Sequence, residues 1–392
     1  MPTRRHFIRS AGIGIVFCSC GLKRAYAQAT TGSLASARTG GSDDGDHPAL
    51  NYKHPDFGKK HAPIVIDGRR VKTVDAHAHC FFHETVVMAG PGVSVNFAVK
   101  GGPQFYLMRD KDAIDWRLAS MDAKGIDTEV LSINPFWYGK DRNVAQEIVS
   151  INNSKLAELC AAHPKRFNAF ASLALQYPDL AVQQLETAMK SPGIRGAAIG
   201  GSVRGTDFSD PKFHPIWAKA EQLGAVLFIH PQSTPQLASR FKGNGWLANT
   251  IGNPLDTTIA LQHLIFEGTL DNFPGLKILA AHGGGYLPSY AARSDHACFV
   301  SPAGCNPDIV LKKEPSQYLN QLYFDSLVFT AEGLRHLVAQ AGAGQIVIGT
   351  DSPIPWQNYP VEHVMNTGDL SGTQQAGILG DNAVKLLNIA DL

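Results

Sequence analysis

The chain has 392 residues, of which 44% are hydrophobic and 18% are charged. This length suits one large α/β barrel or two average domains. With 35 Lys and Arg residues against 34 Asp and Glu residues, the formal net charge is +1, which gives no sign of the clustered basic surface that nucleic acids require. No apolar run is long enough to cross a bilayer. Composition therefore excludes nucleic-acid-binding and membrane-embedded classes of protein.

The N-terminal segment has the order of an export signal. Arg4 and Arg5 are followed by an apolar stretch, residues 11–17, and by Ala-Tyr-Ala at residues 25–27. A basic region, an apolar region and a small-x-small cleavage site are typical of secretory signals, and the arginine pair resembles a bacterial twin-arginine signal. We therefore predict a twin-arginine signal peptide over residues 1–27 and a periplasmic protein that keeps no membrane attachment after cleavage. A basic N-terminus without an export role is the alternative.

The remainder divides into a tether and an alternating α/β segment. Residues 29–50 are rich in Ser, Thr, Gly and Asp, so we predict a flexible tether over residues 28–60. Eight short apolar runs that alternate with amphipathic stretches indicate a (β/α)8 barrel of the TIM type over residues 61–392, and a doubly wound open sheet is the alternative. The predicted strands are 72–77, 128–133, 168–174, 196–199, 225–229, 277–281, 322–325 and 345–348, and the predicted helices are 143–162, 180–190, 214–223, 254–268, 331–341 and 372–387.

Ligand-type side chains follow several of these strands. His77 and His79 end the first strand, and residues two apart in a strand face the same side. His230 follows the fifth strand, His282 the sixth and Asp351 the eighth. The carboxyl ends of barrel strands meet at one face, where barrel active sites form. Imidazole and carboxylate suit zinc and similar divalent metals, so the sequence predicts a metal-dependent active site.

The motifs at these positions resemble a known family. Asp-x-His-x-His at residues 75–79, with His on strands five and six and Asp on strand eight, resembles the amidohydrolase superfamily. Residues 116–126, His-Gly-Gly-Gly at 282–285 and Gly-Thr-Asp-x-Pro at 349–353 look like the aminocarboxymuconate-semialdehyde decarboxylase branch. That branch includes decarboxylases of hydroxybenzoates and related unsaturated acids, and some hydratases and hydrolases.

The resemblance implies a mononuclear metal site. His77, His79, His230 and Asp351 would hold one divalent metal, Zn²⁺ first and Mn²⁺ second, with a water in the open position. His282 would act beside that water as general acid and base, and Asp351 would accept a proton or steer the water. Binuclear relatives use a carboxylated Lys on strand four, whereas residues 195–200 contain no Lys.

Two arginines are predicted to bind the substrate carboxylate, because guanidinium matches carboxylate in a bidentate fork. Arg117 lies where the resembling enzymes place a substrate-binding Arg. Arg293 matches an Arg that relatives lend across a dimer interface, so the resemblance also implies a homodimer. An ordinary ion pair or surface position is the alternative for each.

Some positions depart from the family pattern and leave alternatives open. Gln232 and Ile354 replace aromatic residues of the namesake enzyme, which predicts a different substrate. Decarboxylation of an aromatic or unsaturated acid without a redox cofactor is the first hypothesis, and hydrolysis or hydration of a lactone, ester or enol-type substrate is the second.

Cys298 and Cys305 flank a loop, and in an oxidising compartment they could form a disulfide. Candidate pocket aromatics are Phe81, Phe82, Phe105, Tyr106, Phe136, Trp137 and Trp246.

Overall fold

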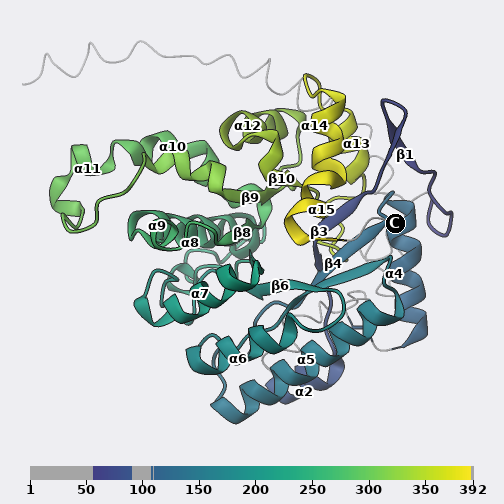
Figure 1. Cartoon of the computed structure of the whole chain (residues 1–392), viewed down its shortest axis with the longest axis horizontal. Coiled ribbons are helices and arrows are strands. Elements are labelled where there is room, and N and C mark those ends of the chain that lie inside the picture. The colour runs from purple at the N-terminus through teal and green to yellow at the C-terminus, as the bar shows by residue number, and fades with distance from the viewer. Residues whose placement is uncertain (1–55, 91–106, 109, 390–392) are drawn as a thin grey trace, which may run out of the picture. The chain divides into compact units, whose positions relative to one another are not determined.

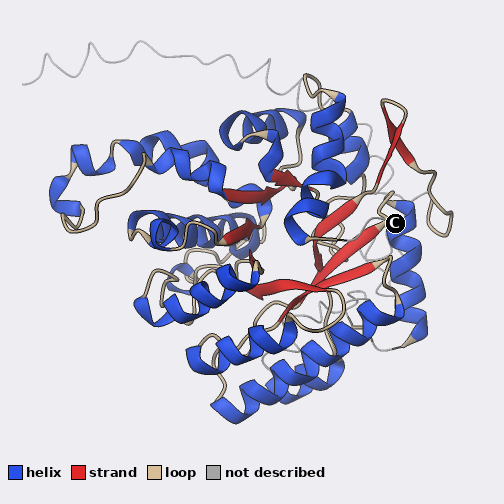
Figure 2. Cartoon of the chain, viewed as in Figure 1, coloured by secondary structure: helices blue, strands red, loops and turns tan. Residues whose placement is uncertain are grey.

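A parallel eight-stranded sheet forms the centre of the protein in a computed structural model that describes residues 56–90, 107–108 and 110–389 (Figure 1). Helices surround the strands, as the colouring of Figure 2 shows. The predicted (β/α)8 barrel is therefore confirmed, and the open-sheet alternative is wrong. The strands are β3 (Val74–His79), β4 (Thr128–Ser132), β5 (Phe167–Ala171), β6 (Ile194–Ile199), β7 (Val226–Ile229), β8 (Lys277–Ala280), β9 (Leu322–Asp325) and β10 (Ile346–Val347).

Closure of the barrel joins its first strand to its last. The strands pair in chain order from β3 to β10, and parallel bridges join Asp75 to Ile348 and Ala78 to Ser352. The amide of Ala76 donates to the Ile348 carbonyl at 2.9 Å. Closure brings the end of β3, which carries two histidines, beside the turn that carries Asp351.

The helices begin and end at ordinary capping signals. Asp141 accepts a hydrogen bond from the amide of Val144 at the start of α5, and Gly224 takes a left-handed conformation at the end of α7, as is common for C-terminal glycine. The principal helices are α2 (His83–Ala89), α4 (Lys111–Ala123), α5 (Arg142–Ala162), α6 (Pro178–Ala188), α7 (His214–Leu223), α8 (Asn253–Phe266), α9 (Thr269–Asn272), α10 (Leu287–Asp295), α11 (Ala297–Val300), α12 (Ala331–Ala341), α13 (Pro360–Met365), α14 (Gly372–Ala376) and α15 (Asn382–Leu387).

The barrel interior is filled with apolar side chains. Phe170 and Phe228 stack there with ring centroids 5.3 Å apart. The C-terminal helix α15 adds Ala383 and Leu386 to the same buried cluster. A π-helical turn, Gly377–Asp381, separates α14 from α15, so the predicted continuous helix 372–387 is interrupted. Gly380 is needed in that turn, because a Cβ there would lie 1.6 Å from the Lys72 carbonyl oxygen.

A short hairpin precedes the barrel and was not predicted. Its strands are β1 (Ile64–Ile66) and β2 (Arg69–Val71). Asp67 and Gly68 join them with φ values of +49° and +79°, as a type I′ turn requires. Three-residue strands are too short to show a clear alternation of apolar residues.

The structure describes the cysteine pair but not the predicted signal peptide. A disulfide joins Cys298 to Cys305 with Cα atoms 5.7 Å apart, so the question left open for this pair is answered. The predicted signal peptide and residues 28–55 of the predicted tether lie outside the described residues. Within the described part of the chain, no helix combines the length and apolarity needed to cross a membrane.

Candidate metal centre

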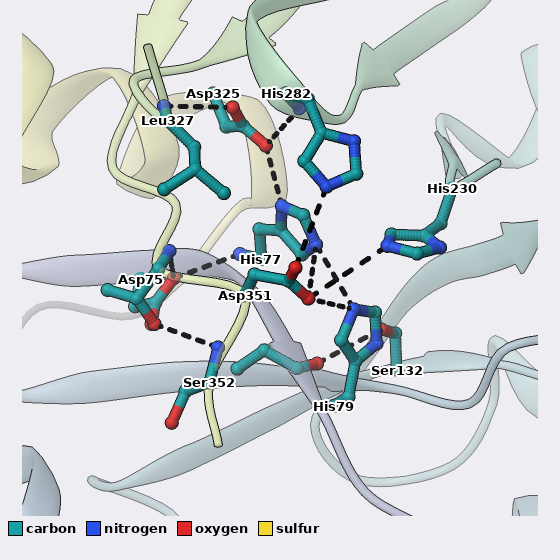
Figure 3. Close-up of polar contacts among 12 residues, drawn as sticks. Asp75, His77, His79, Ser132, His230, His282, Asp325, Leu327, Asp351 and Ser352 are labelled. Atoms are coloured by element: carbon teal, nitrogen blue, oxygen red, sulfur yellow. Dashed lines mark hydrogen bonds and ion pairs between the residues drawn. The ribbon is translucent and has the colours of Figure 1, made fainter. Parts of the chain in front are cut away.

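Five ligand-type side chains meet at the carboxyl end of the barrel (Figure 3). His77 and His79 come from β3, His230 follows β7, His282 follows β8, and Asp351 follows β10. All except His282 are buried, and His282 is partly exposed. The structure therefore brings together the residues that the sequence placed at separate strand ends.

The Asp351 carboxylate lies at the centre of the group. Its Oδ1 is 2.9 Å from His79 Nε2, 3.4 Å from His77 Nε2 and 4.0 Å from His230 Nε2. Its Oδ2 is 3.6 Å from His282 Nε2. Ligand atoms of His77, His230, His282 and Asp351 all lie within 4.8 Å of one another. His79 is outside that set, but its short distance to Asp351 places it in the same site.

A divalent cation fits these residues. Among the described residues, both ring nitrogens of His230 are buried and have no hydrogen-bond partner, and Oδ1 of Asp351 faces the imidazole nitrogens of His79 and His77 at 2.9 and 3.4 Å. Buried polar atoms without partners are costly and rare, and a cation among these side chains would give a His230 nitrogen a partner and would balance the buried carboxylate. Strand β6 contributes no Lys that could bridge two metals. The donor set therefore fits a single divalent ion.

The pKa shifts of Asp351 and His230 favour the deprotonated forms that can bind a cation. Burial raises the pKa of Asp351, but hydrogen bonds with His282 and His77 outweigh burial and hold it well below its usual value. Burial, together with the neighbouring imidazoles, lowers the pKa of His230 well below its usual value. An ionised carboxylate and a neutral imidazole are the forms that bind metals.

His77 differs from the other histidines of the group because it lies between two carboxylates, those of Asp325 and Asp351. Burial lowers its pKa, but hydrogen bonds to Asp325 and Asp351 outweigh burial and raise it to about 10. Its Nδ1 lies 2.6 Å from Asp325 Oδ2, and its Nε2 lies toward the site. Binding of a cation at this nitrogen would therefore displace a proton.

Asp325 is a site residue that sequence reasoning missed. Its Oδ2 also accepts from the His282 amide at 2.8 Å, and its Oδ1 accepts from the amides of Gly283 and Leu327 at 2.9 and 3.0 Å. A carboxylate bound to the far nitrogen of a ligand histidine fixes its tautomer and ring orientation. The available signal was an Asp at the end of the seventh predicted strand.

Left-handed backbone shapes two of the strand ends. His282 has φ of +56° and Asp351 has φ of +57°, a conformation that residues other than glycine rarely adopt and that often marks functional sites. After His282 the chain must pass very close to α8, since a Cβ on Gly285 would lie 2.1 Å from the Pro254 carbonyl oxygen. This contact explains the last glycine of the His-Gly-Gly-Gly motif.

Arg117 lies behind the metal centre. Its side chain has no exposed surface, its Nε donates to Glu129 Oε2 at 2.5 Å, and its Nη2 donates to the carbonyls of His79 and Ser352 at 3.0 and 3.5 Å. These contacts favour a role in positioning the strand ends that carry His79 and Asp351. Binding of a substrate carboxylate by Arg117 stays a prediction.

We expect Arg117→Ala to lower the free energy of unfolding by about 3–5 kcal/mol, because the change leaves buried Glu129 without its partner. Denaturant unfolding measures this effect. The double change Arg117→Met with Glu129→Gln should restore much of the lost stability. Arg142→Ala is the matched control, since Arg142 pairs with Asp179 on the surface and should change little. A higher KM with unchanged stability and metal content would instead favour substrate binding.

The remaining predicted site residues, Arg293 and the candidate pocket aromatics, differ in their exposure to solvent. Arg293 is exposed on α10, close in sequence to the disulfide, and its role across a dimer interface stays a prediction. Trp246 is 56% exposed. Among the remaining candidate pocket aromatics, Phe81, Phe82 and Trp137 are buried in the core, Phe136 is partly buried, and Phe105 and Tyr106 lie outside the described residues.

Comparison with known proteins defines the class of this protein. Residues 74–389 match the amidohydrolase family, and the chain belongs to that family. The structure and the sequence resemblance agree on this assignment.

Several relatives are decarboxylases. The chain is 31% identical over 278 residues to 2-amino-3-carboxymuconate-6-semialdehyde decarboxylase from Dictyostelium discoideum, covering 70% of this chain and 76% of the relative. It is 34% identical over 256 residues to gamma-resorcylate decarboxylase from Rhizobium radiobacter, covering 62% and 77%. A solved dihydroxybenzoic acid decarboxylase from Polaromonas, with bound manganese and the inhibitor 2-nitroresorcinol, has a TM-score of 0.71 and 27% identity, covering 82% of this chain and 98% of that one.

Proposed function

We propose that this protein is a metal-dependent decarboxylase of an aromatic or unsaturated carboxylic acid and uses no redox cofactor. The observation that carries the proposal is the buried group of imidazole and carboxylate ligand atoms around Asp351, in which both ring nitrogens of His230 have no hydrogen-bond partner. The named activities of the relatives support the reaction class. A small aromatic carboxylate is the expected substrate, by analogy with these relatives.

The ligands of the proposed site are His77, His79, His230 and Asp351. When bound, a divalent metal stabilises negative charge on a substrate oxygen and lowers the pKa of a bound water. We propose Zn²⁺ as the metal, with Mn²⁺ as the alternative supported by the relative that carries manganese.

The reaction needs a proton at the carbon that loses the carboxylate. The carbon–carbon bond breaks, its electron pair accepts the proton, and carbon dioxide leaves. We assign the delivery of that proton to His282, and its partial exposure to solvent and the 3.6 Å between its Nε2 and Asp351 Oδ2 support this role. In this proposal the Asp351 carboxylate orients the His282 imidazole, and solvent returns the proton to the pair.

A panel of substrates tests the proposal. The metal-loaded protein is incubated with hydroxybenzoates and with matching lactones, and release of carbon dioxide is compared with release of acid. Carbon dioxide from at least one carboxylate supports the decarboxylase. Lactone cleavage without carbon dioxide from any carboxylate favours the second candidate, a hydrolase or hydratase that uses the same site.

We also propose export to the periplasm. The disulfide between Cys298 and Cys305 supports export, because disulfides persist in oxidising compartments.

We propose further that the protein assembles as a homodimer. The exposed position of Arg293 on α10 leaves its side chain available for a contact between subunits, and sedimentation would detect the dimer.

Replacing Arg4 and Arg5 together by Lys is expected to abolish export, because the arginine pair is what the twin-arginine pathway reads. Fractionation of a bacterial host should find the wild-type protein in the periplasm, with a new N-terminus after Ala27. The double variant should stay uncut in the cytoplasm. Equal periplasmic amounts of the two proteins would contradict the predicted signal.

A further inference from the structure

Three aromatic side chains, two of them exposed and the third, Trp356, partly buried, form a group at the carboxyl end of the barrel. Trp246 and Trp356 stack with centroids 5.8 Å apart and an interplanar angle of 11°, and Phe329 meets the edge of Trp356 at 6.0 Å. Trp246 is 56% exposed and Phe329 is 55% exposed. We call these three residues the rim cluster. Large aromatic rings that pack together and still face solvent are typical of binding surfaces.

The backbone of the rim cluster is also unusual. Trp246 has φ of +51° and Phe329 has φ of +64°, and for bulky residues this left-handed region is a clear outlier. Holding such residues there costs free energy, and such outliers gather at binding sites. The same conformation occurs at His282 and Asp351 in the metal centre. Folding alone gains little from strained, exposed rings, which points to a ligand.

The loops of the rim cluster are continuous with the metal centre. Trp356 is tied to Asp351 by two consecutive turns, in which the amide of Ile354 donates to the Asp351 carbonyl and the Trp356 amide donates to the Ile354 carbonyl. Phe329 follows Asp325 by four residues, and Asp325 contacts both His77 and His282.

Trp246 lies in the connection between β7 and α8, which begins at His230. Its carbonyl accepts from the amides of Asn249 and Thr250 at 2.8 and 3.0 Å, so the turn that presents the ring is internally braced. All three loops follow the carboxyl ends of parallel strands, the end where a barrel binds its substrate.

We propose that the rim cluster is a second substrate subsite, which takes a planar aromatic group attached to the carboxylate substrate at a position remote from the metal. This inference rests on the proposed function, and it identifies the substrate class as two-ring aromatic carboxylates. The outer faces of Trp246 and Phe329 stack on the second ring, while the acid-bearing ring lies at the metal centre. The strained loops present these rings in place before the substrate arrives.

Binding measurements with two probes test the subsite. Salicylate carries one ring, and a hydroxybiphenyl carboxylate carries the same ortho-hydroxy acid with a second ring attached. Titration calorimetry on the metal-loaded protein gives a dissociation constant for each. The wild type should prefer the two-ring probe, and Trp246→Ala should reduce that preference about tenfold, the size expected for one aromatic stacking contact. Trp246→Phe should restore most of it.

The control variant is Phe299→Ala, which removes an aromatic ring that is 85% exposed on α11 and should leave the preference unchanged. An unchanged preference in Trp246→Ala, or no preference in the wild type, would overturn the subsite. A change from dimer to monomer in Trp246→Ala would assign the rim cluster to a contact between subunits instead. Absence of carbon dioxide from every carboxylate of the panel, with these two probes included, would contradict the decarboxylase, whereas the ratio of dissociation constants decides the subsite separately.

Discussion

Asp351→Asn should lose bound metal and activity together. Asp351 is the anion to which four imidazoles are directed, with Nε2 atoms 2.9 to 4.0 Å from its oxygens. An amide keeps the shape of the side chain but removes the charge that attracts a divalent cation. We expect less than one tenth of the wild-type metal per chain and a kcat lower by about a thousandfold, within the range for loss of a metal or a proton-transfer group.

Metal content is measured by elemental analysis after gel filtration, and kcat with the carboxylate that releases most carbon dioxide. His230→Ala removes a ligand from a different strand and should give the same paired loss. The matched control is Glu158→Gln, the same kind of change on the exposed side of α5. Full metal occupancy in both site variants would refute the ligand assignment, and circular dichroism verifies that each variant folds.

Asp325 should prove as important for the metal as a direct ligand. Asp325→Asn can keep the acceptor for the Gly283 and Leu327 amides, but its NH2 group would face two donors, the His282 amide and His77 Nδ1. The His77 ring would then lose the contact that directs Nε2 to the metal. We expect metal affinity to fall about 10–100-fold, as is usual for loss of a carboxylate bound to a ligand histidine.

Competition with a chelating dye measures this affinity. Asp325→Ala should be worse, because four donors lose their acceptor, and should lower the free energy of unfolding by about 3–5 kcal/mol. Asp179→Asn, a carboxylate-to-amide change on the surface of α6, is the control. If Asp325→Asn binds metal as tightly as the wild type, Asp325 serves the fold and not the metal centre.

The eight strands and six of the helices could be predicted from local pattern, whereas α4 and α10 were not predicted. Apolar runs and amphipathic stretches alternate so regularly that β9 and α12 were located to the residue. The short hairpin formed by β1 and β2 was missed because three-residue strands leave no periodic pattern. The break between α14 and α15 was missed because it depends on close contact between Gly380 and Lys72, which local sequence does not reveal.

The candidate metal centre could likewise be predicted only in part. Its side chains could be predicted from the strand ends, since parallel strands bring their carboxyl ends to one face; they are His77, His79, His230, His282 and Asp351. Alternation alone did not predict the shift of register between Asp75 and Ala78 in the pairing of β3 with β4. With that shift, Ala76 packs in the barrel interior while His77 reaches the metal centre.

By itself the sequence determined the family, the barrel and the strand ends that carry the candidate ligands, because these follow from strand periodicity and from short motifs. Only the tertiary structure decided which distant residues support the centre. His77 meets Asp325 across 248 residues of chain, Arg117 is buried against Glu129, and Trp246 stacks on Trp356. Such contacts depend on how loops from different strands converge, and no spacing within the sequence encodes that convergence.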